Sequence, residues 1–434
     1  MILRKTKAYC PICVSELNAS VVERKPRVFL ERRCKKHGMI SSVISNDSSY
    51  YRAASEAYFS LNDCSKGLLW NMSQEYYNLF LTLRCNLDCP ICHVSANREY
   101  SEPSVQQITG QLKDLRNCKI GLFGGEPTLR DDLAEVIRAV LKSGNIPALH
   151  TNGIRLADHG YLKSLKRAGL VEVHLQFDGF SDKPCSIFRG KKLLDVKLRA
   201  LRNLEMLSMP TILQVAVGRG INENNMAGIL DYAAQHGFVR AILYKSYSHL
   251  GRAGLSRDVS LTIDEQIGII EKGTDGRITK ADVLNFQRLI YAFFYMLGQP
   301  RCFYNHYYVV RRNKGGYDPI SGIMRLDDMQ DALMDFIRSK NRIVLFRLLT
   351  NLNRGSLGLI YRAIQTLAMK RLGKHFVFGQ SGLTRRYLII EFGSICDMHN
   401  LDTQSACNCD GGEISSSGRT SSLAYGNIER ERMR

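Results

Sequence analysis

Three cysteines in one short stretch have the spacing of a metal site. Cys85, Cys89 and Cys92 stand as Cys-x3-Cys-x2-Cys directly after the apolar run from Tyr76 to Leu83. Cysteine thiolates hold iron–sulfur clusters, and a cuboidal cluster normally takes four of them. Three thiolates would leave one iron without a protein ligand, and an open coordination position is typical of a site that does chemistry. The alternative is three unrelated buried cysteines, which are common in protein cores.

A second set of candidate ligands lies near the N-terminus. Its two pairs, each with two residues between its members, are Cys10 with Cys13 and Cys34 with His37. Gly38 follows the second pair, where a tight turn often needs a residue without Cβ strain. The pattern predicts a ribbon folded by a tetrahedral Cys3His site that holds zinc or a single iron. We expect a structural role, because the metal would supply folding free energy to a small unit; electron transfer through one iron is the alternative.

Beyond residue 76 the sequence alternates between strand-like and helix-like stretches. The strand-like runs lie at 77–83, 119–123, 146–150, 171–177, 211–217 and 239–244. The stretches between them, such as 131–141, space their apolar residues helically. Repeated strand–helix units imply a parallel sheet. Six units predict an α/β fold with a closed or partial barrel, whose active site gathers on the loops after the strand C-termini.

Glycines, amides and acids lie on these loops. They are Gly124-Gly125-Glu126-Pro127 after the second strand, Thr151-Asn152-Gly153 after the third, Gln176 and Asp178-Gly179 at the end of the fourth, and Gly218, Gly220, Ile221 and Asn222 after the fifth. Each motif alone is more often an ordinary turn. Because all of them belong to one rim of the predicted barrel, we expect them to form one binding site.

The cysteine motif followed by Gly124-Gly125-Glu126 resembles the radical S-adenosylmethionine (SAM) enzymes over residues 76–250. The resemblance implies a 4Fe–4S cluster on the three cysteines, with SAM chelating the fourth iron. It implies that the loop ending at Pro127 meets the SAM ammonium, opposite in charge to Glu126. It also implies ribose contacts from Asn152 and from Gln176 or Asp178, with Gly220-Ile221-Asn222 along the adenine. The implied reaction cleaves SAM to methionine and a 5′-deoxyadenosyl radical, which abstracts hydrogen from an unactivated C–H bond. No catalytic residue is expected beyond the cofactor ligands.

A narrower resemblance extends over most of the chain. The order of ribbon, cysteine motif, 124–129, 150–156 and 175–179 is similar to the archaeal tetraether lipid synthase group and its bacterial relatives. Arg189-Gly190, Gly251-Arg252 and residues 394–399 fit that pattern too. In that group the enzyme couples the methyl ends of two lipid chains, whereas some relatives are associated with pterin methylation. Group membership therefore leaves the substrate open.

The same resemblance implies extra cysteines after the barrel for auxiliary clusters. The stretch 278–287 lacks the cysteine expected nearby, and the remaining candidates are Cys302, Cys396, Cys407 and Cys409. Four thiolates suffice for an auxiliary iron–sulfur cluster only if the fold brings them together. Cys64 is assigned no role.

Length and composition suggest a multidomain protein in a reducing compartment. The 434 residues suit two or three domains: a metal-binding ribbon over 1–65, the barrel over 66–255, an α-rich substrate or auxiliary region over 256–410, and a flexible Ser/Gly-rich tail over 411–434. No apolar run approaches the roughly 20 residues of a membrane span, and no signal peptide is expected. A cytoplasmic location follows, so the thirteen cysteines are interpreted as metal ligands rather than a disulfide framework.

Positive charge is concentrated toward the C-terminus. The net charge is +19, and the stretch 336–390 holds eleven Lys and Arg residues but no Asp or Glu. Apolar residues at helical spacing beside this charge fit an interfacial helix on anionic lipid, which would make the protein peripheral to a membrane. Ordinary helices with a solvated basic face are the alternative. Nucleic-acid binding is a weaker third interpretation, because no recognised nucleic-acid fold signature is present.

These features predict a radical SAM enzyme that draws electrons from a donor such as ferredoxin or flavodoxin. Its leading predicted substrate is a lipid or another anionic molecule with a long apolar part, and its leading reaction is the coupling of lipid chains. Radical methylation or modification of a pterin or peptide is the alternative. A zinc-ribbon nucleic-acid-binding protein is the alternative from another class.

Overall fold

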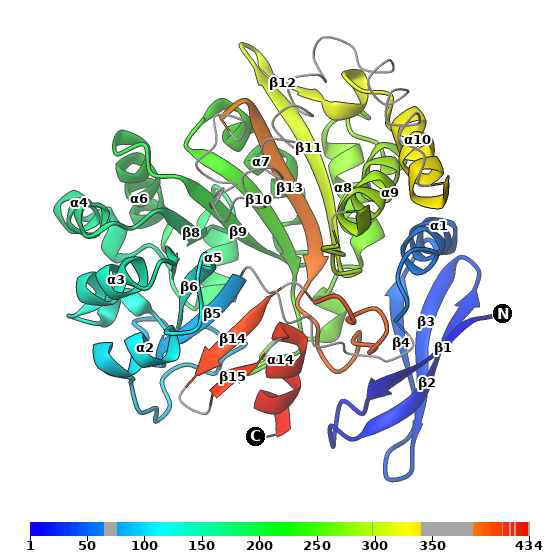
Figure 1. Cartoon of the computed structure of the whole chain (residues 1–434), viewed down its shortest axis with the longest axis horizontal. Helices are drawn as coiled ribbons and strands as arrows, with labels where there is room; N and C mark the ends of the chain where they lie inside the picture. The colour runs from blue at the N-terminus through cyan, green and yellow to red at the C-terminus, as the bar shows by residue number, and fades with distance from the viewer. Residues whose placement is uncertain are drawn as a thin grey trace.

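The computed structural model describes residues 1–64, 76–296, 298–339, 385–409, 411–415, 418–420 and 422–432. These residues form a small N-terminal sheet and a large sheet with helices on its outer side (Figure 1). The expectation of an interfacial helix in the basic stretch 336–390 falls largely on residues 340–384, which lie outside the described residues. Among the described helices, none combines the length and apolar composition that a membrane span requires.

The N-terminal ribbon is a four-stranded antiparallel sheet. Its strands pair in sequence order: β1 (Ile2–Tyr9), β2 (Glu16–Arg24), β3 (Arg27–Cys34) and β4 (Gly38–Ser45). The β1–β2 and β3–β4 turns lie at the same end of this sheet, because successive antiparallel strands reverse direction. Its apolar face, with Val21, Val28 and Leu30, packs against Tyr51 and Tyr58 of α1 (Ser48–Phe59).

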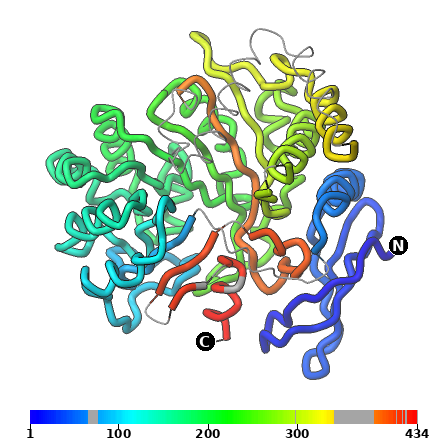
Figure 2. Tube along the Cα trace, in the orientation of Figure 1, coloured from blue at the N-terminus to red at the C-terminus, as the bar shows by residue number. Residues whose placement is uncertain are grey.

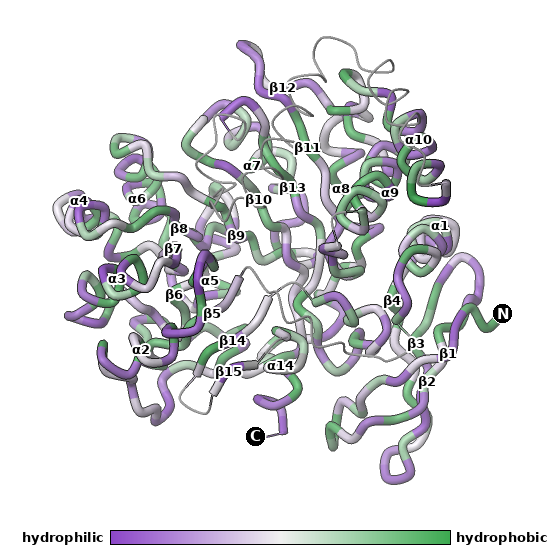
Figure 3. Tube along the Cα trace, viewed as in Figure 1, coloured by the Kyte–Doolittle hydropathy of each residue, from purple (hydrophilic) through white to green (hydrophobic). Residues whose placement is uncertain are grey.

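Six parallel strands form the centre of the large sheet and confirm the predicted partial barrel. They are β5 (Tyr76–Thr82), β6 (Lys119–Gly124), β7 (Ile146–Thr151), β8 (Glu172–Gln176), β9 (Thr211–Val217) and β10 (Val239–Ser246). The connecting segments supply α2 (Val105–Gln111), α3 (Leu133–Lys142), α4 (His159–Ala168), α5 (Asp182–Arg189), α6 (Leu194–Met206) and α7 (Met226–Gln235). The outer helices alternate hydrophilic and hydrophobic residues along their length (Figure 3).

Alternating side chains give the sheet two different faces. In β9, Leu213, Val215 and Val217 are buried in the main core, whereas Ile212, Gln214 and Ala216 are half-buried on the opposite, concave face. The period of two follows from the pleat of a strand. The concave face therefore lies beneath the loops that carry the rim motifs.

Further strands extend the sheet on both sides. The order is β12-β11-β13-β10 at one side and β5-β14-β15 at the other. The added elements on the first side are β11 (Asn305–Asn313), β12 (Gly316–Pro319) and β13 (Tyr387–Ser394), with α8 (Ile263–Gly273), α9 (Lys280–Met296) and α10 (Leu326–Ser339) nearby. The predicted α-rich extension is thus accompanied by three strands that the sequence analysis did not identify.

The expectation of a flexible C-terminal tail is wrong for the described residues. They form β14 (Gly412–Ser415), β15 (Gly418–Thr420) and α14 (Leu423–Arg432). β14 pairs with β5, so the end of the chain lies beside the start of the barrel (Figure 2). Ile414 and Ile428 are fully buried, and this apolar burial anchors a segment whose Ser/Gly composition resembles a linker.

Candidate functional site

The loop after β5 carries Cys85, Cys89 and Cys92, all partly exposed. The backbone N–H of Cys85 donates to the side-chain oxygen of Asn97 at 2.7 Å. The backbone N–H of Ala96 donates to the sulfur of Cys92 at 3.3 Å. An N–H directed at sulfur favours the thiolate, which is the form that binds metal. The loop is therefore fixed by its own hydrogen bonds in a form suited to a metal cluster.

Burial keeps two of these thiols protonated when no metal is bound. It raises the pKa of Cys85 to about 11, although a backbone hydrogen bond from Leu87 opposes the shift. Burial also raises the pKa of Cys89, and the positive charge of Arg189 opposes it. A coordinated metal deprotonates a thiol outright, so these residues suit a bound cluster better than a free thiolate. The donor set, three thiolates with one position open, fits a 4Fe–4S cluster that binds a further ligand.

A loop after β10 supports the cysteine loop from the other side. The backbone N–H of Arg252 donates to the carbonyl of Cys92 at 3.0 Å, and its guanidinium donates to the carbonyl of Cys89 at 3.1 Å. A Cβ atom on Gly251 would lie 2.1 Å from the carbonyl oxygen of Cys92. Since real side chains cannot approach so closely, glycine is required for this contact.

The Gly124-Gly125-Glu126 loop lies against the end of β5. The N–H of Gly125 donates to the carbonyl of Thr82 at 2.7 Å, and that of Glu126 donates to the carbonyl of Arg84 at 2.8 Å. Added Cβ atoms would lie 2.1 Å from the Thr82 oxygen at Gly124 and 2.3 Å from the Arg84 oxygen at Gly125. The glycines therefore fix this loop beside the cysteines.

The Glu126 carboxylate ties neighbouring loops together. It is only 1% exposed and accepts hydrogen bonds from the Thr128 hydroxyl at 2.6 Å, the Thr151 hydroxyl at 2.7 Å and the Asn152 N–H at 2.7 Å. Burial raises the pKa of Glu126, and these bonds oppose the shift. Its first role is thus to position the rim; a role as counter-charge to the SAM ammonium stays a prediction.

The remaining predicted rim residues also come together. The side-chain amide of Asn152 donates to Asn86 of the cysteine loop at 2.7 Å, and the amide of Gln176 donates to Asp178. Asp178 is only 1% exposed. It accepts two hydrogen bonds from the Arg189 guanidinium, at 2.9 and 3.1 Å. All three side chains are therefore engaged within the protein, and Asn152 and Gln176 differ from Asp178 in being half-buried; ribose contacts from any of them stay a prediction.

The sequence analysis missed Lys197, which lies on α6 directly behind the rim. It is only 1% exposed, and its ammonium donates to the carbonyls of Asn152 and Gln176. Burial lowers the pKa of Lys197 to about 8. A signal was present: Lys197 falls three and four residues before the buried Ala200 and Leu201, on the apolar stripe of its helix.

The ribbon brings its four predicted ligands into one cluster. The His37 Nδ1 atom lies 3.4 Å from the Cys10 sulfur and 3.5 Å from the Cys34 sulfur, and the sulfurs of Cys13 and Cys34 are 3.8 Å apart. A tetrahedral zinc ion with its usual bond lengths separates two sulfurs by about 3.8 Å, and sulfur from nitrogen by about 3.6 Å. The residues therefore fit a single tetrahedral ion.

The C-terminal cysteines do not all behave as predicted. Cys407 forms a disulfide with Cys64, whose Cα atoms are 5.7 Å apart, so the interpretation of Cys407 as a cluster ligand is not what the structure shows. The interpretation of the thirteen cysteines as metal ligands rather than a disulfide framework therefore does not extend to this pair. Cys302, Cys396 and Cys409 lie in one apolar cluster beside the ribbon turn, and an auxiliary cluster on them stays a prediction.

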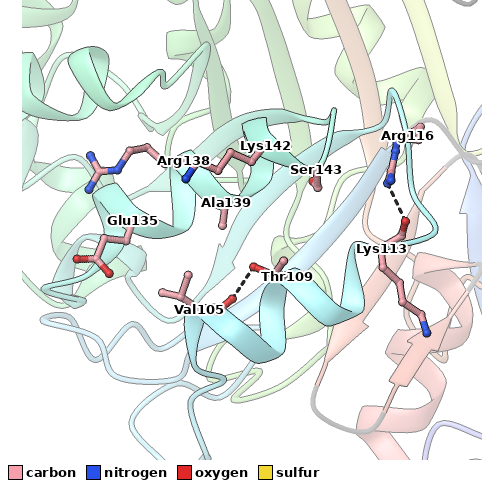
Figure 4. A pocket seen from close by; sticks show the side chains of 9 residues that line it. All are labelled: Val105, Thr109, Lys113, Arg116, Glu135, Arg138, Ala139, Lys142 and Ser143. Atoms are coloured by element: carbon pink, nitrogen blue, oxygen red, sulfur yellow. Dashed lines mark hydrogen bonds between the residues drawn. The ribbon is translucent and has the colours of Figure 1, made fainter.

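A groove of about 540 Å³ lies between α2 and α3 on the outer side of the barrel (Figure 4). Its lining includes four cationic side chains and one carboxylate: Lys113, Arg116, Arg138, Lys142 and Glu135. None of the predicted cofactor or metal residues lines it. The groove is therefore separate from the rim site.

Comparisons with known proteins agree with this geometry. Residues 79–233 match the radical SAM superfamily, and residues 2–46 match the HMPTM N-terminal zinc ribbon domain. The chain is 34% identical over 305 residues to 7,8-dihydro-6-hydroxymethylpterin dimethyltransferase of Methanocaldococcus jannaschii, which covers 64% of this chain and 60% of that protein. It is 32% identical over 167 residues to "Probable GTP 3′,8-cyclase" of Pyrococcus abyssi, covering 38% of this chain and 53% of that protein. The chain thus spans 60% or less of the length of these two curated relatives.

The solved structures that align with this chain have lower sequence identity to it than the two curated relatives. Streptococcus suis SuiB bound to S-adenosylmethionine aligns with a TM-score of 0.40 and 17% identity, over 46% of this chain and 47% of that one. Methylornithine synthase aligns with a TM-score of 0.37 and 15% identity, over 52% of this chain and 68% of that one.

Proposed function

We propose that the chain, whose residues 79–233 match the radical SAM superfamily, is an enzyme that cleaves SAM reductively and activates a C–H bond of its substrate. Members of this superfamily use a 4Fe–4S cluster to deliver the electron that SAM cleavage needs. Cys85, Cys89 and Cys92 would hold the cluster. The observation that carries the proposal is the fixed three-cysteine loop, which is hydrogen-bonded to the Gly124–Pro127 loop through β5 and to the loop after β10.

The protein's own residues would orient SAM and keep the site rigid. Gly124 and Gly125 let the backbone come close to the cofactor position, and Glu126 fixes Asn152 beside the cysteine loop. Arg189 holds Asp178 in place. Because these groups are already in position, little free energy is needed to reorganise them during the reaction.

The reaction that the comparisons support best is radical methylation of a pterin-type heterocycle. The relative named as a pterin dimethyltransferase aligns over 305 residues. The ribbon, residues 2–46, matches the HMPTM N-terminal zinc ribbon domain. The predicted coupling of lipid chains lacks a comparable observation, because the basic stretch that suggested it lies largely outside the described residues. We therefore place the predicted alternative, pterin methylation, ahead of lipid coupling. The electron donor is proposed to be acidic, as ferredoxin and flavodoxin are, since the chain carries a net charge of +19.

Anaerobic reconstitution tests the proposal. The protein would be loaded with iron and sulfide, mixed with SAM and a reductant, and assayed for 5′-deoxyadenosine. Dihydropterin would then be added with SAM carrying a labelled methyl group, and a polar lipid extract would serve as the competing substrate. We expect 5′-deoxyadenosine and labelled methyl groups on the pterin. A protein that binds one zinc, stays colourless and leaves SAM intact would overturn the proposal.

A further inference from the structure

The concave face of the barrel carries a connected chain of polar side chains beneath the cofactor rim. Its centre is Gln214 on β9, whose amide nitrogen lies 3.3 Å from the Nδ1 atom of His150 on β7 and 3.1 Å from that of His174 on β8. The two imidazole rings are 4.3 Å apart between centroids. Three strands thus contribute one connected, polar group of side chains to the inside of the barrel.

The second nitrogen of each imidazole also has a hydrogen-bond partner. His150 Nε2 bonds the hydroxyl of Tyr76, which lies 2.7 Å from the side-chain oxygen of Asn78. His174 Nε2 lies 2.8 Å from a carboxylate oxygen of Glu172. The lysine Lys119 donates to the same oxygen at 2.7 Å. The chain therefore runs from Asn78 on β5 to Lys119 on β6 through the centre of the barrel.

Elementary chemistry assigns the hydrogens in this chain. Glu172 is an ionised acceptor: burial would raise its pKa, but Lys119 and His174 outweigh burial, and the pKa falls to about 2. His174 must then donate through Nε2, so its Nδ1 accepts from Gln214. Burial lowers the pKa of His150 well below its usual value, so His150 is neutral. It accepts from Gln214, donates to Tyr76, and leaves the Tyr76 hydroxyl to donate to Asn78.

This assignment leaves one group free at the centre of the chain and one at its Asn78 end. The Gln214 side chain uses both amide hydrogens, and its oxygen accepts no hydrogen bond from the described residues. The Asn78 side chain uses its oxygen, and its amide nitrogen donates to none of the described residues. One free acceptor and one free donor therefore remain on the concave face.

Glycine at position 121 makes room for the chain. A Cβ atom there would lie 2.6 Å from the Tyr76 hydroxyl, 2.8 Å from the Asn78 oxygen and 2.9 Å from His150 Nε2. Any other residue would push these three groups apart. The close packing of Tyr76, Asn78 and His150 therefore depends on Gly121.

The two imidazoles lie one layer of side chains below the predicted ribose contacts, whereas Gln214 is in register with Gln176. His150 precedes Asn152 by two residues, and His174 precedes Gln176 by two residues on the next strand. Residues two apart on a strand share a face, so the imidazoles lie directly under the predicted ribose contacts. Tyr76, His150 and Gln214 are half-buried rather than sealed, and the ring of Phe123 meets His150 edge-on at 5.4 Å. The layer offers both flat ring surfaces and polar edges.

We propose that this layer is the substrate-recognition surface, and that it takes a flat, neutral nitrogen heterocycle. Gln214 Oε1 accepts from an exocyclic amino group at the ring edge, and Asn78 Nδ2 donates to a ring nitrogen or carbonyl. The proposal rests on the proposed radical SAM function and narrows its substrate. The methyl ends of lipid chains would leave both polar groups unpaired, and an unpaired buried polar group is costly. A heterocycle with both kinds of edge, such as a pterin, satisfies them.

Direct binding tests this inference separately from catalysis. Cluster-loaded protein without SAM would be titrated with 6-hydroxymethyl-7,8-dihydropterin, followed by pterin fluorescence, and with the analogue in which oxygen replaces the exocyclic amino group. We expect the wild type to prefer the pterin about tenfold or more. Gln214→Met should lose this preference, because it removes the acceptor, while the surface variant Gln106→Met should keep it.

A second variant covers the case in which Gln214→Met does not fold. Asn78→Asp keeps the oxygen that accepts from Tyr76 but removes the free N–H, and should weaken both ligands about tenfold. Formation of 5′-deoxyadenosine without substrate should persist in the control Gln106→Met, whose side chain is exposed. If the wild type cleaves no SAM but shows the pterin preference, the proposed reaction fails and the recognition surface stands. Equal binding of the two ligands by the wild type, or unchanged binding in both variants, would overturn the inference.

Discussion

The ribbon and the barrel both gather cysteines, but they hold them in different ways. In the ribbon, the ligand atoms of Cys10, Cys13, Cys34 and His37 all lie within 4.8 Å of one another. Two turns at one end of a small sheet supply all four. Among the described residues, no other group of three or more such ligands is so close, so the three barrel cysteines stand farther apart. This wider spacing suits a multi-iron cluster rather than one ion.

The two sites also differ in what surrounds them. The ribbon ligands come from one unit, residues 2–46, that matches a zinc ribbon domain, and four ligands complete a tetrahedral ion. The barrel loop has three ligands and is hydrogen-bonded to loops after β6 and β10. Four protein ligands that complete the coordination of a metal ion stabilise a fold. Three ligands leave one coordination position open, and such a site suits a ligand that exchanges. The comparison predicts opposite consequences when each site is emptied.

Removing the barrel ligands should have the largest effect on activity. The triple change of Cys85, Cys89 and Cys92 to Ala is expected to abolish 5′-deoxyadenosine formation, because the cluster has no other ligand. The unfolding temperature should change little, since the loop keeps its backbone hydrogen bonds to Thr82 and Arg252. Cys118→Ala, a buried cysteine outside the loop, is the matched control. Retained SAM cleavage in the triple variant would refute the ligand assignment.

Removing the ribbon metal should reverse this pattern. Structural zinc contributes about 10–16 kcal/mol of binding free energy in small zinc domains, so Cys13→Ser or a chelator should unfold residues 1–46. Hydrogen exchange of the β1–β4 amides would then become fast, while SAM cleavage at the distant barrel loop should fall less than tenfold. Loss of cleavage with the ribbon still protected would mean that the ribbon metal takes part in catalysis and would break the comparison.

The ligands in both sites could be predicted because their signals are local in sequence. Cys-x2-Cys and Cys-x2-His pairs place two ligands on one turn, and an apolar run before Cys85 marks the strand that positions it. The six central strands were predictable for the same reason, since each is a short, mostly apolar or alternating stretch of sequence. The strand β9 has the bounds 211–217 that its apolar run indicates.

The parts that could not be predicted depend on contacts between distant residues. β14 pairs with β5 across more than 300 positions of sequence, and its Ser/Gly surroundings carry no periodic signal. The engagement of Asp178 by Arg189 and of Glu126 by Thr128 and Thr151 depends on side-chain packing that one sequence does not specify. The pairing of Cys64 with Cys407 likewise joins residues 343 positions apart.

Loosening the support of the barrel site should have an intermediate effect. Arg189→Lys replaces a guanidinium that donates two hydrogen bonds to Asp178 with an ammonium that cannot match that geometry. We expect SAM cleavage to fall about tenfold, with the cluster spectrum unchanged because the cysteines remain. The exposed Arg199→Lys on α6 is the control. An equal loss in both variants would mean that Arg189 acts only through general stability.

The smallest expected effect concerns Lys197, which supports the rim from behind. Burial lowers its pKa in the folded protein from about 10.5 to about 8, so the unfolded chain binds one more proton between these values. Stability contributed by this group should therefore rise with pH from about 8 to 10, with a slope of up to about 1.4 kcal/mol per pH unit. Lys197→Met should remove that slope in urea unfolding, whereas the exposed Lys192→Met should keep it. A slope that is the same in all three proteins would show that the pKa of Lys197 is the same in the folded and the unfolded chain, and that burial behind the rim does not disfavour its charge.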